Sequence, residues 1–143
     1  MLVGLGHVDL VCRDVARSLE FYAAVFGRLG LQPPHEVRGE RGETIHYLRF
    51  PQPGSGSIGL RPALEEQPFE LYAPGFHHLA IAVEGTADVE LAYESALAAG
   101  AEILHAPRLW PVYHPDYYAT FFHDPDGFQI EVTASKDARI VGT

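Results

Sequence analysis

The sequence predicts an α+β fold built from two tandem βαβββ modules. Two observations lead to this prediction. The order strand, helix and three short strands occurs twice along the 143 residues, and His78 follows His7 by 71 positions, each near the start of its copy. We expect one domain over 1–143, made of module one at about 1–61, a linker at 62–75, module two at about 76–134 and a C-terminal tail at 135–143.

The charge balance and the cysteine count limit the classes of partner and the location. Ten Lys and Arg stand against nineteen Asp and Glu, a net charge of −9, which argues against nucleic acid or an acidic membrane surface as a partner. No apolar run reaches the length of a membrane span, and residues 1–5 lack the basic start of a signal peptide. With Cys12 as its single cysteine, the chain is expected in the reducing cytoplasm.

Module one begins with an apolar segment at 2–12, which is typical of a strand. Asp14 is placed to cap a helix that Gly27 and Gly30 end. The apolar face expected for this helix consists of Val15, Leu19, Tyr22, Phe26 and Leu29. Three short strands are expected at 35–38, 44–50 and 57–61, and the proline-containing stretch after them has no period.

Module two repeats this order. A strand is expected at 76–83, where alternation would turn His77 to the face opposite His78. Thr86 is placed to cap a helix. The residues expected on its inner face are Val89, Tyr93, Ala96 and Leu97. The strands expected after it are 101–105, 117–123 and 128–134, with a loop at 106–116 and a tight turn at 124–127.

Three polar residues stand out by their places in the repeat. His7, His78 and Glu131 lie in the first and last strands of the copies, and buried charged groups need partners or metals. The repeat spacing places the counterpart of Glu131 near Gly59 and Leu60.

Four segments, Gly6-His7, Arg17–Tyr22, His77–Val83 and Asp124–Glu131, together resemble the vicinal oxygen chelate superfamily. That superfamily includes glyoxalase I, extradiol dioxygenases, fosfomycin-resistance transferases and bleomycin-binding proteins. The resemblance implies a half-open eight-stranded barrel around one divalent metal, with His7, His78 and Glu131 at ligand positions. It places Gly59 at the fourth position, which is a Glu in glyoxalases.

Two imidazoles and one carboxylate with open coordination sites suit Fe(II), with Mn, Ni, Zn or Mg as alternatives. We therefore expect a metal-dependent enzyme acting on a small substrate with vicinal oxygens. The open sites favour dioxygenase-like chemistry slightly over glyoxalase-like lyase or isomerase chemistry, although Phe121 replaces the proton-donating Tyr of extradiol enzymes. The alternative is a non-catalytic protein that binds or sequesters a small molecule or drug.

Other positions are candidates for contact with substrate or for proton transfer. The candidate substrate-binding residues are Asp9, Arg61, Ala119 and Phe121. His114 is the candidate catalytic residue, and the other side chains able to move a proton are His46, His123 and Tyr117. Uncovered sheet edges, together with the resemblance, favour a homodimer.

Overall fold

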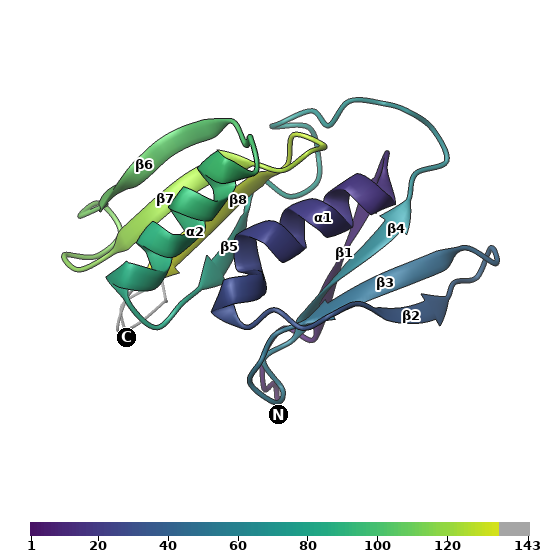
Figure 1. Ribbon diagram of the computed structural model, residues 1–143, viewed down its shortest axis with the longest axis horizontal. Coiled ribbons are helices and arrows are strands. Elements are labelled where there is room, and N and C mark those ends of the chain that lie inside the picture. The colour runs from purple at the N-terminus through teal and green to yellow at the C-terminus, as the bar shows by residue number, and fades with distance from the viewer. Residues whose placement is uncertain (135–143) are drawn as a thin grey trace. The chain divides into compact units, whose positions relative to one another are not determined.

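The computed structural model describes residues 1–134 and confirms the α+β fold with the βαβββ order twice over. Contacts divide the chain after Gln67 into two compact units, here unit 1 and unit 2 (Figure 1). Each unit holds one four-stranded mixed sheet and one long helix. The tail expected at 135–143 lies outside the described residues.

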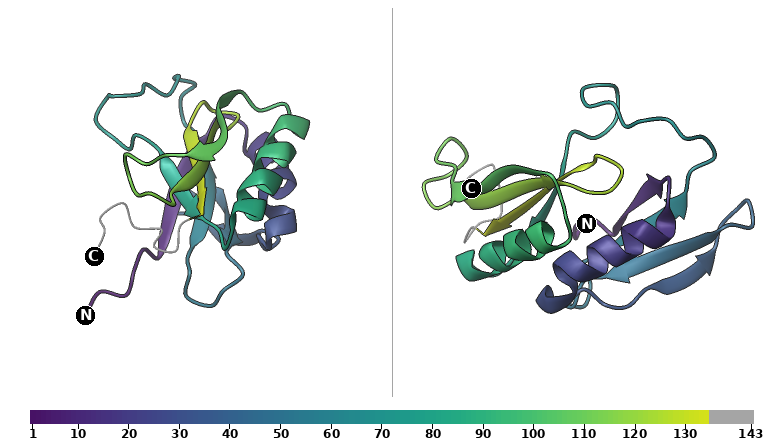
Figure 2. Two further views of the ribbon diagram at one scale, coloured as in Figure 1. Left: turned by 90° about the vertical axis from the view of Figure 1, so that its left-hand side faces the viewer. Right: turned by 45° about the horizontal axis from the view of Figure 1, so that its top comes forward.

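Unit 1 has the sheet order β1-β4-β3-β2, in which β1 and β4 are parallel and the other pairs are antiparallel. Its elements are β1 (His7–Cys12), α1 (Val15–Phe26), a 3-10 turn (Gly27–Leu29), β2 (His35–Arg38), β3 (Thr44–Arg49) and β4 (Ser57–Pro62). The helix α1 lies along the sheet and packs on β4 (Figure 2). Side chains such as Leu10, Leu48 and Leu60 form the buried layer of this unit.

The start of α1 follows from its capping residue. The carboxylate of Asp14 accepts a hydrogen bond of 3.1 Å from the backbone N–H of Arg17, as predicted. The buried face of the helix differs from the expected one by about one position. It is formed by Ser18, Phe21, Tyr22, Val25 and Phe26.

Unit 2 repeats the arrangement with the sheet order β5-β8-β7-β6. Its elements are β5 (Leu79–Ala82), α2 (Thr86–Ala98), β6 (Ile103–Leu109), β7 (Tyr118–His123) and β8 (Gln129–Ala134). The helix α2 packs on β6, β7 and β8 (Figure 1). None of the helices in the described residues is long and apolar enough to cross a membrane.

Four local predictions for unit 2 are wrong. The strand expected at 76–83 is only Leu79–Ala82, so His78 lies just before it. The N-cap of α2 is Gly85, whose N–H donates to Asp88, and Thr86 is already helical. Leu97 is 49% exposed, because the buried face of α2 follows Val89, Ala92 and Ala96. In addition, β6 extends to Leu109, into the region expected to be a loop.

The strand registers show that the two units are true structural repeats. In unit 1, Gly59 on β4 lies opposite Asp9 on β1 and Tyr47 on β3. In unit 2, Glu131 on β8 lies opposite Ala80 on β5 and Phe121 on β7. Position 59 is therefore the counterpart of position 131, as the repeat spacing predicted to within one residue.

Candidate functional site

The charged centre of unit 2 is a buried carboxylate held by two side chains. Glu131 is 1% exposed, and its Oε2 lies 2.9 Å from Nε2 of His78. The hydroxyl of Tyr117 donates to the other oxygen, Oε1, at 2.5 Å. A buried carboxylate is stable only where such partners replace water, so these three side chains form one polar cluster.

The backbone around Glu131 explains its fixed position. It lies on β8, which is paired on both sides, by β5 and β7. The tight turn before β8 is closed by Asp124, whose Oδ1 accepts hydrogen bonds from the N–H groups of Asp126 and Phe128, both at 2.9 Å. Gly127 adopts a left-handed conformation with φ of 86°, which a glycine tolerates without strain. The predicted turn thus sets the register that places the carboxylate.

His77 does not turn away from His78, contrary to the prediction from strand alternation. The Nδ1 atoms of the two rings lie 2.9 Å apart, at hydrogen-bonding distance. The prediction is wrong because β5 starts at Leu79, so the two histidines precede the strand and do not alternate. His77 thereby holds the nitrogen of His78 that does not face Glu131, which fixes the direction of the ring.

An aromatic surface lies beside this cluster. Phe121, opposite Glu131 in the β7–β8 register, has its ring centroid 6.0 Å from that of His78. The rings of Trp110 and His105 lie 5.0 Å and 5.7 Å from Phe121. Ala119 is fully buried, and its carbonyl accepts a hydrogen bond from the indole of Trp110. The predicted substrate-contact residues Phe121 and Ala119 therefore belong to one apolar, aromatic cluster.

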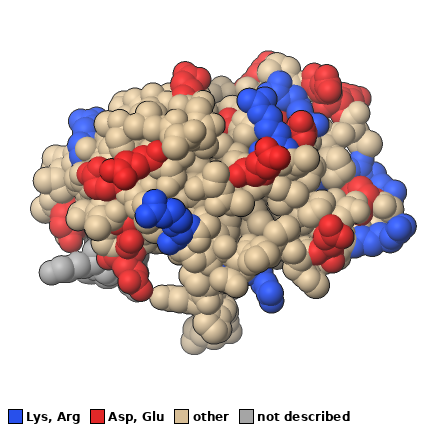
Figure 3. Space-filling view, viewed as in Figure 1, with Lys and Arg blue, Asp and Glu red and all other residues tan. Residues whose placement is uncertain are grey.

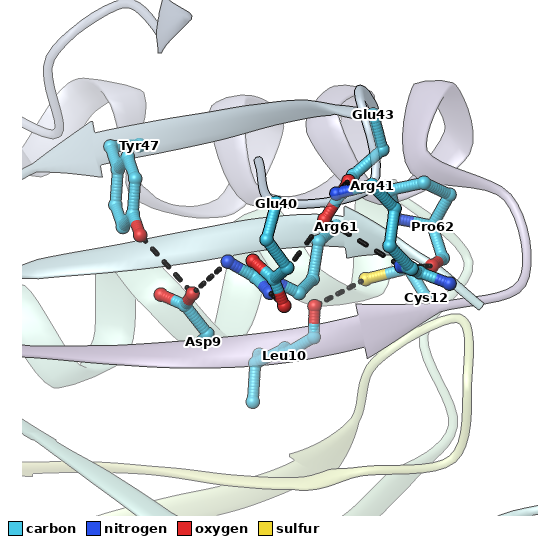
Figure 4. Close-up of polar contacts among 9 residues, drawn as sticks. All are labelled: Asp9, Leu10, Cys12, Glu40, Arg41, Glu43, Tyr47, Arg61 and Pro62. Carbon is cyan, nitrogen blue, oxygen red and sulfur yellow. Dashed lines mark hydrogen bonds and ion pairs between the residues drawn. The ribbon is translucent and has the colours of Figure 1, made fainter. Parts of the chain in front are cut away.

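In unit 1, the predicted residues Asp9 and Arg61 are brought together as an ion pair. Nη2 of Arg61 lies 3.0 Å from Oδ2 of Asp9, and its Nη1 lies 3.6 Å and 3.8 Å from Glu40 and Glu43 (Figure 4). Tyr47 donates its hydroxyl to the same Asp9 oxygen at 3.1 Å. The charge of Arg61 is thus already balanced by carboxylates of its own unit.

His7 is exposed at the start of β1, and its ring meets that of Tyr47 edge-on, with centroids 5.6 Å apart. His114 lies on the loop after β6, half-exposed, where it pairs with Asp116. His46 pairs with Glu36 at 3.3 Å and His123 with Glu102 at 3.2 Å. Among the predicted proton carriers of unit 2, Tyr117 is therefore the one that contacts Glu131.

The donor atoms of unit 2 fit part of a metal site. His78 Nε2 and Glu131 Oε2 are 2.9 Å apart, close to the separation of about 3.0 Å between neighbouring ligands of an octahedral ion with bonds of ~2.1 Å. Imidazole and carboxylate are both common ligands of divalent ions. Within either unit of the described chain, no three His, Cys, Asp or Glu side chains gather into a complete site. Water, substrate or a further protein donor would have to complete the coordination.

The buried hydroxyl of Tyr117 predicts a specific pH dependence. Burial and the hydrogen bond to Glu131 raise the pKa of Tyr117 to about 12 from 10.0. Folding favours the protonated form, so the stabilisation is present in full below pH 10 and is lost as the pH rises to about 12. Over that window, the free energy of unfolding should fall by about 2–3 kcal/mol more in the wild type than in Tyr117→Phe. Urea unfolding at several alkaline pH values measures this difference, and parallel curves for the two proteins would contradict it.

Comparison with known proteins identifies the family. Residues 4–132 match the Glyoxalase/Bleomycin resistance protein/Dioxygenase superfamily, so the chain belongs to this family. A protein named Glyoxylase I 4 from Arabidopsis thaliana is 29% identical over 92% of this chain and 70% of its own length. Lactoylglutathione lyase from Escherichia coli O157:H7 is also 29% identical, over 92% of this chain and 93% of its own length.

Solved structures share the fold. A glyoxylase/bleomycin resistance protein/dioxygenase domain from Frankia sp. EAN1pec matches with a TM-score of 0.78 and 24% identity, covering 97% of this chain and 96% of its own. The fosfomycin resistance protein FosX from Listeria monocytogenes, in complex with Mn(II) and sulfate, matches with a TM-score of 0.65 and 17% identity, covering 96% of both chains. These matches show that the fold is shared, while the family match over residues 4–132 confirms the superfamily that the sequence motifs indicated.

Proposed function

We propose that this chain is a divalent-metal-dependent enzyme that acts on a small substrate with two vicinal oxygens, by lyase or isomerase chemistry. The observation that carries the proposal is the buried cluster of Glu131, His78 and Tyr117. Burying the carboxylate of Glu131 costs free energy that a well-packed apolar side chain would not, so its presence beside an aromatic surface favours a functional role. The same cost argues against a protein that only sequesters a drug.

His78 through Nε2 and Glu131 through a carboxylate oxygen would hold the ion, with His7 as the third protein ligand. We favour Fe(II), with Mn, Ni, Zn or Mg as alternatives. The bound ion would supply Lewis acidity to the two substrate oxygens. Phe121 and Trp110 would exclude water and favour a flat, apolar substrate body.

The choice of lyase or isomerase chemistry rests on proton transfer. Such a reaction moves a proton on the substrate and needs no oxygen, and the relatives that share 29% identity carry the names of glyoxalase and lyase enzymes. Gly59 offers no carboxylate as a base, so Glu131 is the acceptor that this chain provides. With Oε2 held for the ion beside His78, Oε1 would be the proton acceptor, and the hydroxyl of Tyr117 bonded to it would carry the proton between the substrate and this oxygen.

Dioxygenase chemistry, which the sequence slightly favoured, is the second candidate. The aromatic surface around Phe121 suits a flat catechol-like substrate, and this observation supports testing for dioxygenase activity. Against it, Phe121 has no proton to donate. We rank it below lyase or isomerase chemistry because Tyr117 and Glu131 can hold and move a proton without oxygen.

One experiment separates these functions. The purified chain, loaded anaerobically with Fe(II) or Mn(II), is offered a panel of vicinal-oxygen compounds, lactoylglutathione and catechols among them, while substrate and dissolved oxygen are followed. We expect substrate turnover without oxygen uptake, lost in His78→Ala. Oxygen uptake that depends on His7 and His78 would establish the dioxygenase, and tight substrate binding without metal or turnover would establish the binding protein.

We further propose a cytoplasmic homodimer with a small-molecule substrate as its partner. Each four-stranded sheet has two edge strands, β1 and β2 or β5 and β6, which need cover. Cys12, the single cysteine of the sequence, is buried and forms no disulfide, which supports a reducing compartment. On the face shown in Figure 3, basic side chains are interspersed with acidic ones and form no continuous basic stripe, so this face offers no footprint for nucleic acid.

A further inference from the structure

We propose that Arg108, on β6 of unit 2, binds a carboxylate group of the substrate at the end that lies away from the two vicinal oxygens. The substrate is then a flat, apolar compound that carries a carboxylate as well as the vicinal oxygens. The inference rests on the proposed function and deepens it by naming this second recognition group. Every residue that carries it belongs to unit 2.

The charge distribution of unit 2 sets Arg108 apart. Between residues 68 and 134 the sequence contains ten Asp and Glu, and Arg108 is the single Lys or Arg. The ion pairs that the described residues of this unit form all use histidine as the cation. Among the described residues, the exposed guanidinium of Arg108 therefore has no carboxylate partner. It can receive an anion from outside the chain.

An irregularity in β6 turns Arg108 to the face of the sheet that carries Glu131. His105 lies opposite Phe121 in the pairing of β6 with β7. Arg108, three positions further along β6, lies opposite Ala119, which is only two positions from Phe121. Residues three apart in a regular strand would point to opposite faces, so the bulge between them re-aims Arg108. Because Phe121 is paired with Glu131 on β8, the guanidinium and the carboxylate share one face.

The indole of Trp110 holds the guanidinium in place. Cζ of Arg108 lies over the ring, 3.7 Å from its centroid, as in a direct cation–π contact. The indole N–H donates to the carbonyl of Ala119 at 3.2 Å, and the backbone N–H of Trp110 donates to the carbonyl of Tyr117 at 2.7 Å. A guanidinium stacked on a fixed ring keeps its N–H donors at its edge, where a carboxylate can accept two hydrogen bonds.

A row of aromatic rings joins Arg108 to the charged centre of the unit. The ring of Trp110 lies 5.0 Å from that of Phe121, which lies 6.0 Å from that of His78, the partner of Glu131. A flat substrate body lying along this row would have one end at His78 and the other at Arg108. The negative charge of Glu131 at one end and the positive charge of Arg108 at the other would fix the direction in which the substrate binds.

The test uses Trp110, the single tryptophan of the sequence, as a fluorescent reporter of its own surroundings. Benzoate and benzamide share a flat ring and differ in charge. Each is titrated into metal-free wild type, Arg108→Gln and Arg28→Gln. Arg28 is an exposed arginine in the 3-10 turn of unit 1, so the control removes the same charge from the other unit.

We expect benzoate to change the emission of Trp110 saturably, with an affinity roughly 10-fold or more above that of benzamide. Arg108→Gln should lower the benzoate affinity to the level of benzamide, whereas Arg28→Gln should bind benzoate as the wild type does. The amide measures the contribution of the aromatic row alone, and the difference between the two compounds measures the contribution of Arg108.

Wild-type benzoate affinity in Arg108→Gln overturns the inference, and so does a benzamide affinity equal to that of benzoate, or no saturable change with either compound. An equal loss of affinity in Arg28→Gln also overturns it, because net charge would then be responsible. The titration needs no metal, so its result is separate from that of the proposed function, which fails if His78→Ala retains its metal.

Discussion

His78→Ala is expected to abolish stoichiometric binding of a divalent ion and, with it, turnover. The ring of His78 supplies Nε2 beside Glu131 at 2.9 Å and is fixed through its other nitrogen by His77. Alanine removes the only imidazole that the described part of unit 2 places against this carboxylate. The measurement is metal content per chain after loading with Mn(II) or Fe(II) and gel filtration, compared with about one ion per chain in the wild type.

The matched control is His123→Ala. This histidine belongs to the same unit, but it pairs with the exposed carboxylate of Glu102, which lies just before β6. Its removal should leave the metal content unchanged. If His78→Ala kept its metal and its circular dichroism spectrum, the assignment of His78 as a ligand would be wrong.

Glu131→Gln should reduce turnover about as strongly as His78→Ala does, with little effect on folding. The amide keeps the shape of the side chain; its oxygen can still accept from Tyr117, and its NH2 group can donate to Nε2 of His78, so the buried cluster stays bonded. It loses the negative charge that both the ion and the proton transfer require. We expect metal affinity to fall by roughly 10–100-fold and kcat by about 100-fold or more.

Glu131→Ala separates the chemical role from the structural one. It leaves the buried hydroxyl of Tyr117 without its acceptor, which should destabilise the fold by about 1–3 kcal/mol, measured by urea unfolding. Glu131→Gln should unfold close to the wild type. Normal kcat in Glu131→Gln would show that this carboxylate is neither base nor ligand.

The repeat and its strands could be predicted from the sequence because apolar alternation and turn residues are local. The cap at Asp14, the turn at 124–127 and the counterpart of Glu131 at Gly59 are confirmed. The orientation of His77 was predicted wrongly, since it depends on where β5 begins, and that boundary leaves no mark in the sequence.

Contacts between segments far apart in the chain could not be predicted from the sequence. Arg61 meets Glu40 and Glu43 only because the β2–β3 loop approaches β4, and no spacing along the chain indicates this. Tyr117 was one of several candidate proton carriers in the sequence. It becomes the partner of Glu131 because the pairing of β7 with β8 brings the two residues together. The candidate residues were therefore identified by type, whereas their partners were set by tertiary contacts.

The most direct test of the proposed metal centre is an anomalous-difference map from crystals grown with Mn(II). We expect one strong peak per chain, within bonding distance of His78 Nε2 and a carboxylate oxygen of Glu131, with His7 as a further ligand. A map with no peak at these atoms, from crystals whose protein is shown to carry Mn(II), would contradict the metal centre proposed for this chain.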